Sequence, residues 1–360
     1  MALTTVDQGL LSTNAQYTGF KNRLINSAMV IDQRNAGASV TLPDGAGNYS
    51  FVTDRFACAR ASGATATGIQ SSTAPTGFNN SLLITNGTGI TVSSSGQGYI
   101  THFIEGYNVA DLGFGTANAK TVTLSFWVQS SITGTHSGAL NNSAFNRSYP
   151  FTFTISSANT WTQVSVTIAG DTSGTWLTTN GRGICVTFNN GSGSTYLGTA
   201  SAWAGATYFG ATGSVALNSV TSSTFYITGV QLEKGSTATS FDYRPYGTEL
   251  QLCQRYYWRQ GGSNAYQYFG LGFAYNTTNA TFTINNPVPM RATPSSLDYS
   301  TIGVNDGATL TAVTSVSADL LSPIINQINA TVASGLTQFR PMRILANNST
   351  SAYLGFNAEL

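Results

Sequence analysis

Alternation with a period of two residues is the dominant pattern of this 360-residue chain. In PFTFTI at 150–155, Phe151, Phe153 and Ile155 share one side and the intervening threonines take the other; WTQVSVTI at 161–168 repeats the pattern. Successive side chains of a strand point to opposite faces, so each segment predicts a strand with one packed and one wet face. Clusters of Gly, Asn and Ser separate the segments, which is typical of antiparallel sandwiches. The pattern therefore predicts an all-β protein.

The low charge of the chain excludes several function classes. Charged residues make up 8% of the sequence, against about 25% in an average soluble domain. The chain is nevertheless 41% hydrophobic, whereas intrinsic disorder needs low hydrophobicity and high net charge. The net charge is only +1 and the basic residues are scattered, so neither a nucleic-acid groove nor an anionic membrane patch is indicated.

The cysteines and the N-terminal residues bear on the compartment. Cys58, Cys185 and Cys253 are odd in number and widely spaced, so we expect buried thiols and no disulfide framework. Residues 1–20 lack the basic and apolar regions of a secretory signal peptide, and no run of apolar residues is long enough to span a membrane. We expect synthesis in a cytoplasm, with export, if any, by assembly or lysis.

The organisation of the chain predicts an arm and two domains. Helical periodicity is scarce, and the best candidate is 248–257, where Thr248 can cap the helix. We expect a short N-terminal arm at 1–21, a large β-sandwich at 22–246 and a second, smaller β-sandwich at 247–360.

Three strings of residues have a distinctive order and spacing. The first is NRLINSAM at 22–29 followed by IDQRNAG at 31–37, and the second is the run Asp54-Arg55-Phe56. The third is VQLEKG at 230–235, continued by FDYRPYG at 241–247 and CQRYY at 253–257. Together they resemble a family of tailed-bacteriophage tail-fibre or appendage proteins, in which the second string usually ends in Trp.

This resemblance implies a jelly roll similar to carbohydrate-binding modules, in a virion protein made in the cytoplasm of a bacterial host. It implies a homotrimer whose N-terminal arm docks to a phage tail, neck or capsid protein, and which binds host surface polysaccharide without nucleic-acid contacts or membrane insertion. One alternative is a capsid-decorating or neck fibre protein without a receptor role. Another is a capsule depolymerase.

Catalytic patterns are sparse, so we expect no enzyme. The chain has 14 acidic residues and two histidines, and it lacks nucleophile-elbow, zinc-protease and phosphate-loop motifs. The one chemistry left open is a glycosidase carboxylate pair. Its candidates are Asp54, Glu105, Asp111 and Asp171; the alternative is that these acids cap turns and pair with arginines.

Aromatic clusters are the best binding candidates, because sugars stack their C–H faces on aromatic rings. The glycan-binding candidates are Trp203, Tyr208, Phe209, Trp258, Tyr266 and Tyr268. The alternative is burial in contacts between subunits. No cofactor is expected apart from Ca²⁺ near Asp32 and Asp54, which otherwise form ion pairs that hold the N-terminal strand.

Overall fold

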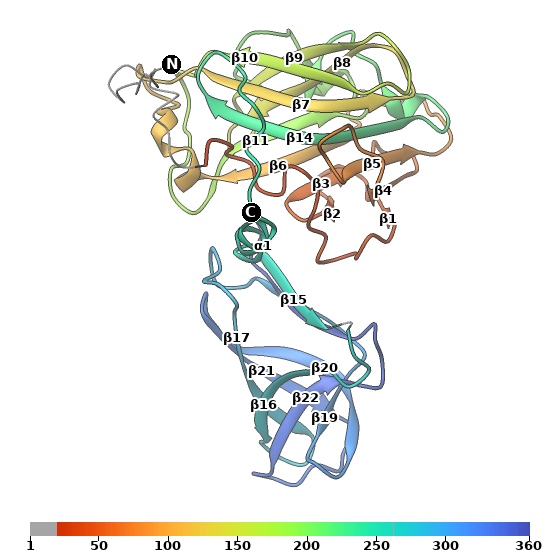
Figure 1. Cartoon of the computed structure of the whole chain (residues 1–360), viewed down its shortest axis with the longest axis vertical. Coiled ribbons are helices and arrows are strands. Elements are labelled where there is room, and N and C mark those ends of the chain that lie inside the picture. Colours follow the sequence, from red (N-terminus) through yellow and green to blue (C-terminus); the bar gives the residue numbers. More distant parts are fainter. Residues whose placement is uncertain (1–19, 262) are drawn as a thin grey trace, which may run out of the picture. The chain divides into compact units, whose positions relative to one another are not determined.

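The computed structural model describes residues 20–261 and 263–360 (Figure 1). The expected docking arm at 1–21 therefore lies outside the described residues, except for its last two. The chain divides into two compact units, of which one ends at Tyr246 and the other runs from Gly247 to Leu360. The fold is all-β, as the alternation predicts, with one short α-helix, α1 (Tyr246–Gln254), among the described residues. This helix begins two residues earlier than expected, so that Thr248 lies inside it and does not cap it. It also ends earlier than expected, because Tyr257 already starts a strand.

The first unit is a jelly-roll sandwich of two six-stranded antiparallel sheets. In spatial order, the first sheet contains β1 (Val40–Thr41), β4 (Ala66–Ser71), β5 (Ser81–Asn86), β14 (Thr224–Lys234), β7 (Val122–Ser130) and β10 (Thr162–Ile168). The second contains β2 (Ser50–Thr53), β3 (Phe56–Ala59), β6 (Tyr99–Glu105), β11 (Arg182–Asn189), β8 (Gly134–Asn141) and β9 (Ser148–Ile155). A small parallel pair, β12 (Leu197–Gly198) and β13 (Gly210–Ala211), accompanies them. Short 3-10 helices lie at Gly106–Asn108, Ala110–Leu112, Ser194–Tyr196 and Leu217–Ser219.

The core of this sandwich is aromatic and lies between the two sheets. Phe126 of β7 contacts Phe188 of β11 and Phe153 of β9, with ring centroids 5.0 and 5.1 Å apart. The alternating residues of the sequence pattern supply the inward faces. Burial of these apolar faces is the main force that holds the sheets together.

The residue strings noted in the sequence join the two ends of the first unit. The Asn22 side chain donates from Nδ2 to the carbonyl of Val230 (2.9 Å) and accepts at Oδ1 from the Leu232 backbone (3.1 Å). Arg244 donates from Nη1 to the Leu24 carbonyl (2.9 Å). Residues at 22–24 and 230–244, far apart in the sequence, are thus fixed side by side.

The second unit is also β-rich, but its larger sheet closes on itself. The barrel strands, in order, are β16 (Tyr268–Ala274), β17 (Asn279–Asn285), β21 (Ile325–Val332), β20 (Leu310–Leu321), β19 (Ile302–Asn305) and β22 (Pro341–Ala346). A three-stranded sheet contains β15 (Tyr257–Gly261), β23 (Tyr353–Asn357) and β18 (Ser296–Ser300). Alternation alone does not distinguish an open sandwich from a barrel, because both place every second residue inside.

The three cysteines are buried and none forms a disulfide, as expected from their spacing. Burial raises the pKa of Cys58, and it raises the pKa of Cys185 to about 12. These two thiols therefore stay protonated and act as small apolar side chains. Within the described part of the chain, no helix has the length and apolar character needed to cross a membrane.

Buried His102 predicts a pH-dependent stability for the first unit. Its Nε2 lies 3.2 Å from the Ile25 nitrogen and 3.0 Å from the Ile25 oxygen. Burial, followed by the nearby charge of Arg55, holds the pKa of His102 well below its usual value. The unfolded chain, with a histidine pKa of about 6.5, therefore binds this proton more readily than the folded chain. Stability should fall as the pH drops below about 6.5, by up to about 1.4 kcal/mol per pH unit for this residue.

Urea unfolding between pH 7.5 and pH 5.5 tests this expectation by tryptophan fluorescence. Burial also lowers the pKa of His136, so a His102→Gln variant should show a shallower slope that is not zero. Equal slopes in the wild type and the variant would contradict the assignment.

Candidate functional site

Strand β6 carries large side chains on both of its faces. Ile100 and Ile104 belong to the core between the sheets, whereas Tyr99, Thr101 and Phe103 alternate with them and point to the opposite side. All seven residues of the strand are buried. The face of the sheet that a simple sandwich leaves wet is therefore covered here.

Aromatic residues from the loops cover this face. The Phe209 ring lies 4.9 Å from the Tyr99 ring and 5.2 Å from the Tyr196 ring, on which it is stacked. Phe145 meets Phe209 edge-on at 5.9 Å. These rings form a second, smaller apolar cluster on the outer side of the sheet. Because the rings pack on one another, their positions are fixed before any ligand arrives.

The cover leaves a cavity of about 410 Å³. Its lining residues are Gly47, Tyr49, Gln97, Tyr99, Thr101, Phe103, Phe145, Arg182, Thr187, Tyr196, Thr207 and Phe209. Half of them are aromatic, and most of the others bear a hydroxyl, amide or guanidinium group. Among these lining residues there is no carboxylate.

Hydrogen bonds orient the polar groups of this pocket. Arg182 stacks over the Phe103 ring at 4.1 Å and donates from Nη2 to the Tyr49 hydroxyl (2.9 Å). Gln97 donates from Nε2 to the Tyr196 hydroxyl (2.8 Å), so the hydroxyl hydrogen of Tyr196 can be donated to a ligand. Burial, and after it the neighbouring Tyr49, raises the pKa of Tyr99 to about 12. The Tyr99 hydroxyl is thus neutral at physiological pH.

Of the predicted aromatics in the first unit, Phe209 alone lines this pocket. The neighbouring Tyr208 packs its ring against Gly198, where a Cβ atom would lie 2.3 Å from the ring. Trp203 packs on the core, and its Nε1 donates to the Ala169 carbonyl (2.7 Å). The structure therefore does not bring Trp203, Tyr208 and Phe209 together in one binding site.

The predicted aromatics of the second unit lie in two different environments. Trp258 is buried, stacks on Phe356 at 5.3 Å and donates from Nε1 to Asn286 (2.9 Å). Tyr266 and Tyr268 are 51% and 54% exposed. A glycan-binding role for these two exposed rings stays a prediction.

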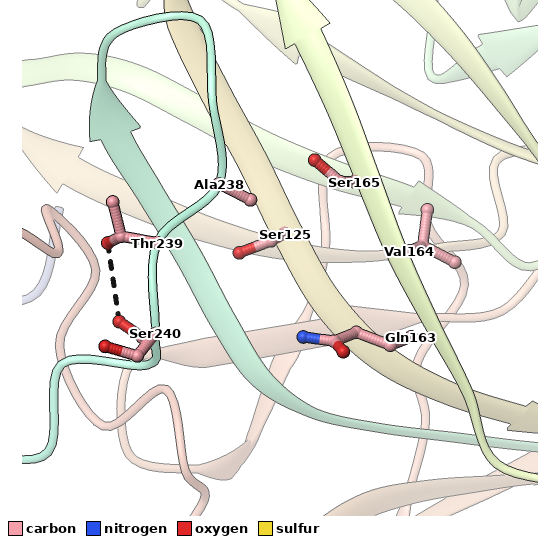
Figure 2. A pocket seen from close by; sticks show the side chains of 7 residues that line it. All are labelled: Ser125, Gln163, Val164, Ser165, Ala238, Thr239 and Ser240. Atoms are coloured by element: carbon pink, nitrogen blue, oxygen red, sulfur yellow. Dashed lines mark hydrogen bonds between the residues drawn. The ribbon is translucent and has the colours of Figure 1, made fainter.

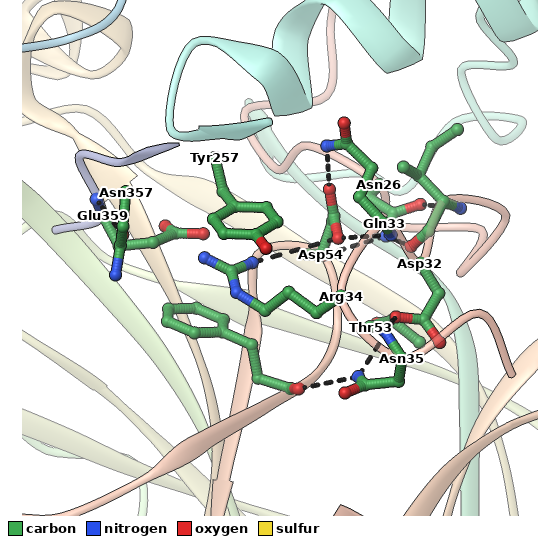
Figure 3. A network of polar contacts seen from close by, with 12 residues as sticks. Asn26, Asp32, Gln33, Arg34, Asn35, Thr53, Asp54, Tyr257, Asn357 and Glu359 are labelled. Carbon is green, nitrogen blue, oxygen red and sulfur yellow. Dashed lines mark hydrogen bonds and ion pairs between the residues drawn. The ribbon is translucent and has the colours of Figure 1, made fainter. Parts of the chain in front are cut away.

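Asp32 and Asp54 lie in a network of polar contacts (Figure 3). Asp54 is 1% exposed and accepts from the backbone and the side chain of Gln33 (3.0 and 2.5 Å). Asp32 accepts from the backbone of Asn35 (3.0 Å), and Arg34 Nη1 lies 3.9 Å from an Asp54 oxygen. Burial, more than repulsion by Asp54, raises the pKa of Asp32.

These contacts, mainly hydrogen bonds, connect the loop at 31–37 to Asp54. Across the described residues, no group of three or more His, Cys, Asp or Glu side chains is arranged to hold a metal ion. A calcium site at Asp32 and Asp54 stays a prediction.

The four acids considered as a carboxylate pair have separate surroundings. Arg147 binds Asp171 through two hydrogen bonds of 2.7 Å. Asp111 is half-exposed and pairs with Arg23 at 2.9 Å. Glu105 is buried at the end of β6. Asp171 and Asp111 are thus held in ion pairs with different arginines.

Sequence reasoning missed most of the pocket. Tyr99 and Phe103 were hidden inside YITHFIE at 99–105, where one face of the strand carries Ile100 and Ile104 and the other carries the two rings. This pattern could have indicated the pocket, because the solvent-facing side of a strand is usually polar, and two aromatic rings on that side indicate that something covers it. Tyr49, Tyr196 and Arg182 come from distant parts of the chain, and only the fold brings them together.

No family model matches the chain, and no curated protein matches it. Among solved structures, the enzymatically active domain of tailspike protein 4 from bacteriophage CBA120 is similar at 10% identity and a TM-score of 0.30, over 59% of this chain and 21% of that one. A putative sugar binding protein from Bacteroides thetaiotaomicron is similar at 13% identity and a TM-score of 0.33, over 60% of this chain and 100% of that one. A family 11 carbohydrate-binding module from Clostridium thermocellum, in complex with a mixed-linked tetrasaccharide, is similar at 10% identity and a TM-score of 0.28, over 56% and 98%. Because each TM-score lies below 0.5, the functional conclusion depends on the residues of the site.

Proposed function

We propose that this chain is a non-catalytic, glycan-binding subunit of a bacteriophage virion, in a tail fibre or receptor-binding appendage. The observation that carries the glycan part is the pocket over β6. The half-buried rings of Tyr49, Phe145 and Tyr196 offer apolar surface to the C–H groups of a sugar, above the buried rings of the pocket. Gln97, Arg182 and the tyrosine hydroxyls offer hydrogen bonds to sugar hydroxyls. The phage part is supported by the residue strings between 22 and 257.

We also propose that the pocket binds glycans without cleaving them, because of the chemistry of its lining residues. Glycoside hydrolysis commonly needs two carboxyl groups on either side of the scissile bond. None of the described lining residues is an acid, and Asp171 and Asp111 are paired with arginines. The pocket is therefore suited to reversible binding.

Glycan binding and turnover can be tested together on the full chain. We expect it to bind surface polysaccharides on an array of bacterial glycans, because stacking and hydrogen bonding act on intact sugar chains. Incubation with a bound polysaccharide should produce no new reducing ends. Failure to bind any glycan would refute the binding role, whereas new reducing ends would favour the depolymerase alternative.

A homotrimer completes the proposal. Single sugar sites of this kind are weak, and several copies held together multiply their effect without any new contact. A virion protein that decorates a capsid or neck would share the fold without binding a receptor. Locating the protein in images of intact particles distinguishes a tail fibre or receptor-binding appendage from a capsid or neck decoration.

A further inference from the structure

The segment after β14 is fixed to the outer face of its own strand. Glu233 is 3% exposed; its Oε1 accepts from the Thr239 backbone (2.8 Å) and its Oε2 from the Thr239 hydroxyl (2.7 Å). Buried Gln231 accepts from the Asp242 backbone (2.8 Å). The segment 238–242 therefore stands as a ridge along β14.

Two further contacts fix the turn that leads into this ridge. Thr123 of β7 donates to the Gly235 carbonyl (2.8 Å). Thr167 of β10 donates to the Ser236 carbonyl (3.0 Å). The turn and the ridge together are thus attached to three adjacent strands, which gives the ridge a defined position relative to the sheet.

Between this ridge and β10 lies a groove of about 460 Å³, with β7 as its floor (Figure 2). Its lining residues are Ser125, Gln163, Val164, Ser165, Ala238, Thr239 and Ser240. Figure 2 shows Ser125 of β7 between Gln163 and Ser165 of β10 on one side and the segment 238–240 on the other. The lining offers hydroxyls and an amide, and none of its seven residues is ionisable.

One indole ring, that of Trp127, lies on the same outer face of β7 as the groove. Trp127 is the register partner of Gln163 and follows Ser125 by two residues on β7, so its side chain lies on the same face as both. Gly229, at φ 61°, lies beside Phe78 and Trp127, since a Cβ there would lie 2.6 Å from Phe78 Cζ and 3.2 Å from Trp127 Cδ1. An aromatic ring beside neutral hydrogen-bonding groups is the combination that recognises a sugar.

We propose that this groove is a second carbohydrate site, selective for a neutral saccharide. It does not depend on the pocket over β6, because the two lie on the outer sides of opposite sheets of the sandwich. The uncharged lining favours neutral sugars, since nothing in it compensates the desolvation of a carboxylate or sulfate group. Two sites on one unit let a single subunit contact two strands of polysaccharide.

Saturation-transfer NMR on the full chain tests this inference with cellotriose, maltotriose and β-1,4-galactotriose. Ser165→Trp fills the groove from an exposed strand position, and Gln163→Ala removes its amide without touching the core. The matched control is Thr154→Trp, which adds the same ring at an exposed position of β9. We expect Ser165→Trp to weaken binding of at least one trisaccharide about tenfold and the control to leave it unchanged.

A Tyr196→Ala variant separates the two sites. Trisaccharide binding that survives Tyr196→Ala and is weakened about tenfold in Ser165→Trp supports the groove, even if the pocket has no ligand. Binding that Ser165→Trp and Gln163→Ala both leave at the wild-type level overturns the second site, as does the absence of binding by all three trisaccharides. Neither result bears on charged glycans in the pocket.

Discussion

Replacing Tyr196 by alanine is expected to weaken glycan binding in the pocket over β6 about thirtyfold. The change removes a ring that stacks on Phe209 at 5.2 Å, together with the hydroxyl that accepts from Gln97. A buried aromatic contact at the centre of a site commonly carries about 2 kcal/mol of binding free energy, which corresponds to this loss. Isothermal titration with a polysaccharide fragment selected on the array measures it directly.

The control for this variant is Tyr107→Ala. Tyr107 belongs to the same unit and is exposed, but it does not line the pocket. Its removal should leave the affinity unchanged, and both variants should keep the wild-type circular dichroism spectrum. Equal affinities for Tyr196→Ala and wild type would place the glycan elsewhere on the molecule.

The fold class was predictable from the sequence because its physical cause is local. Phe151, Phe153 and Ile155 alternate with threonines, and one buried face is enough to define a strand. The closure of β16 to β22 was not predictable, because it depends on which strands pair and not on their alternation. The barrel in the second unit is the result of that long-range pairing.

The candidate site was less predictable, because sequence reasoning favours aromatics in loops rich in small residues. Phe209 in such a loop does line the pocket, whereas Trp203 from the same loop packs on the core. The difference is the direction of each side chain, which the loop conformation sets. Tyr99 and Phe103 were overlooked because their strand looks like ordinary core.

The residue strings were recognisable in the sequence, but their physical role was not. Asn22 and Arg244 join the two ends of the sandwich, and Glu233 holds the ridge beside the groove. These are structural tasks that need particular polar groups at particular positions. A distinctive string of residues can therefore stabilise the framework around a site without supplying the residues that contact the ligand.

Glu233→Ala should lower the free energy of unfolding of the first unit by about 2–4 kcal/mol. The buried carboxylate accepts from the Thr239 backbone and hydroxyl and from Gln231 Nε2 (2.9 Å), so its removal leaves these donors without their acceptor. Glu233→Gln keeps one carbonyl oxygen and should lower the free energy of unfolding by about half as much.

Asp111→Ala is the matched control for Glu233→Ala, since the half-exposed ion pairs of Asp111 contribute at most about 1 kcal/mol. Urea unfolding followed by tryptophan fluorescence reports mainly on this unit, which holds Trp127, Trp161, Trp176 and Trp203. A loss no larger than that of Asp111→Ala would mean that the ridge is not held by Glu233, and the groove beside it would then lack a fixed wall.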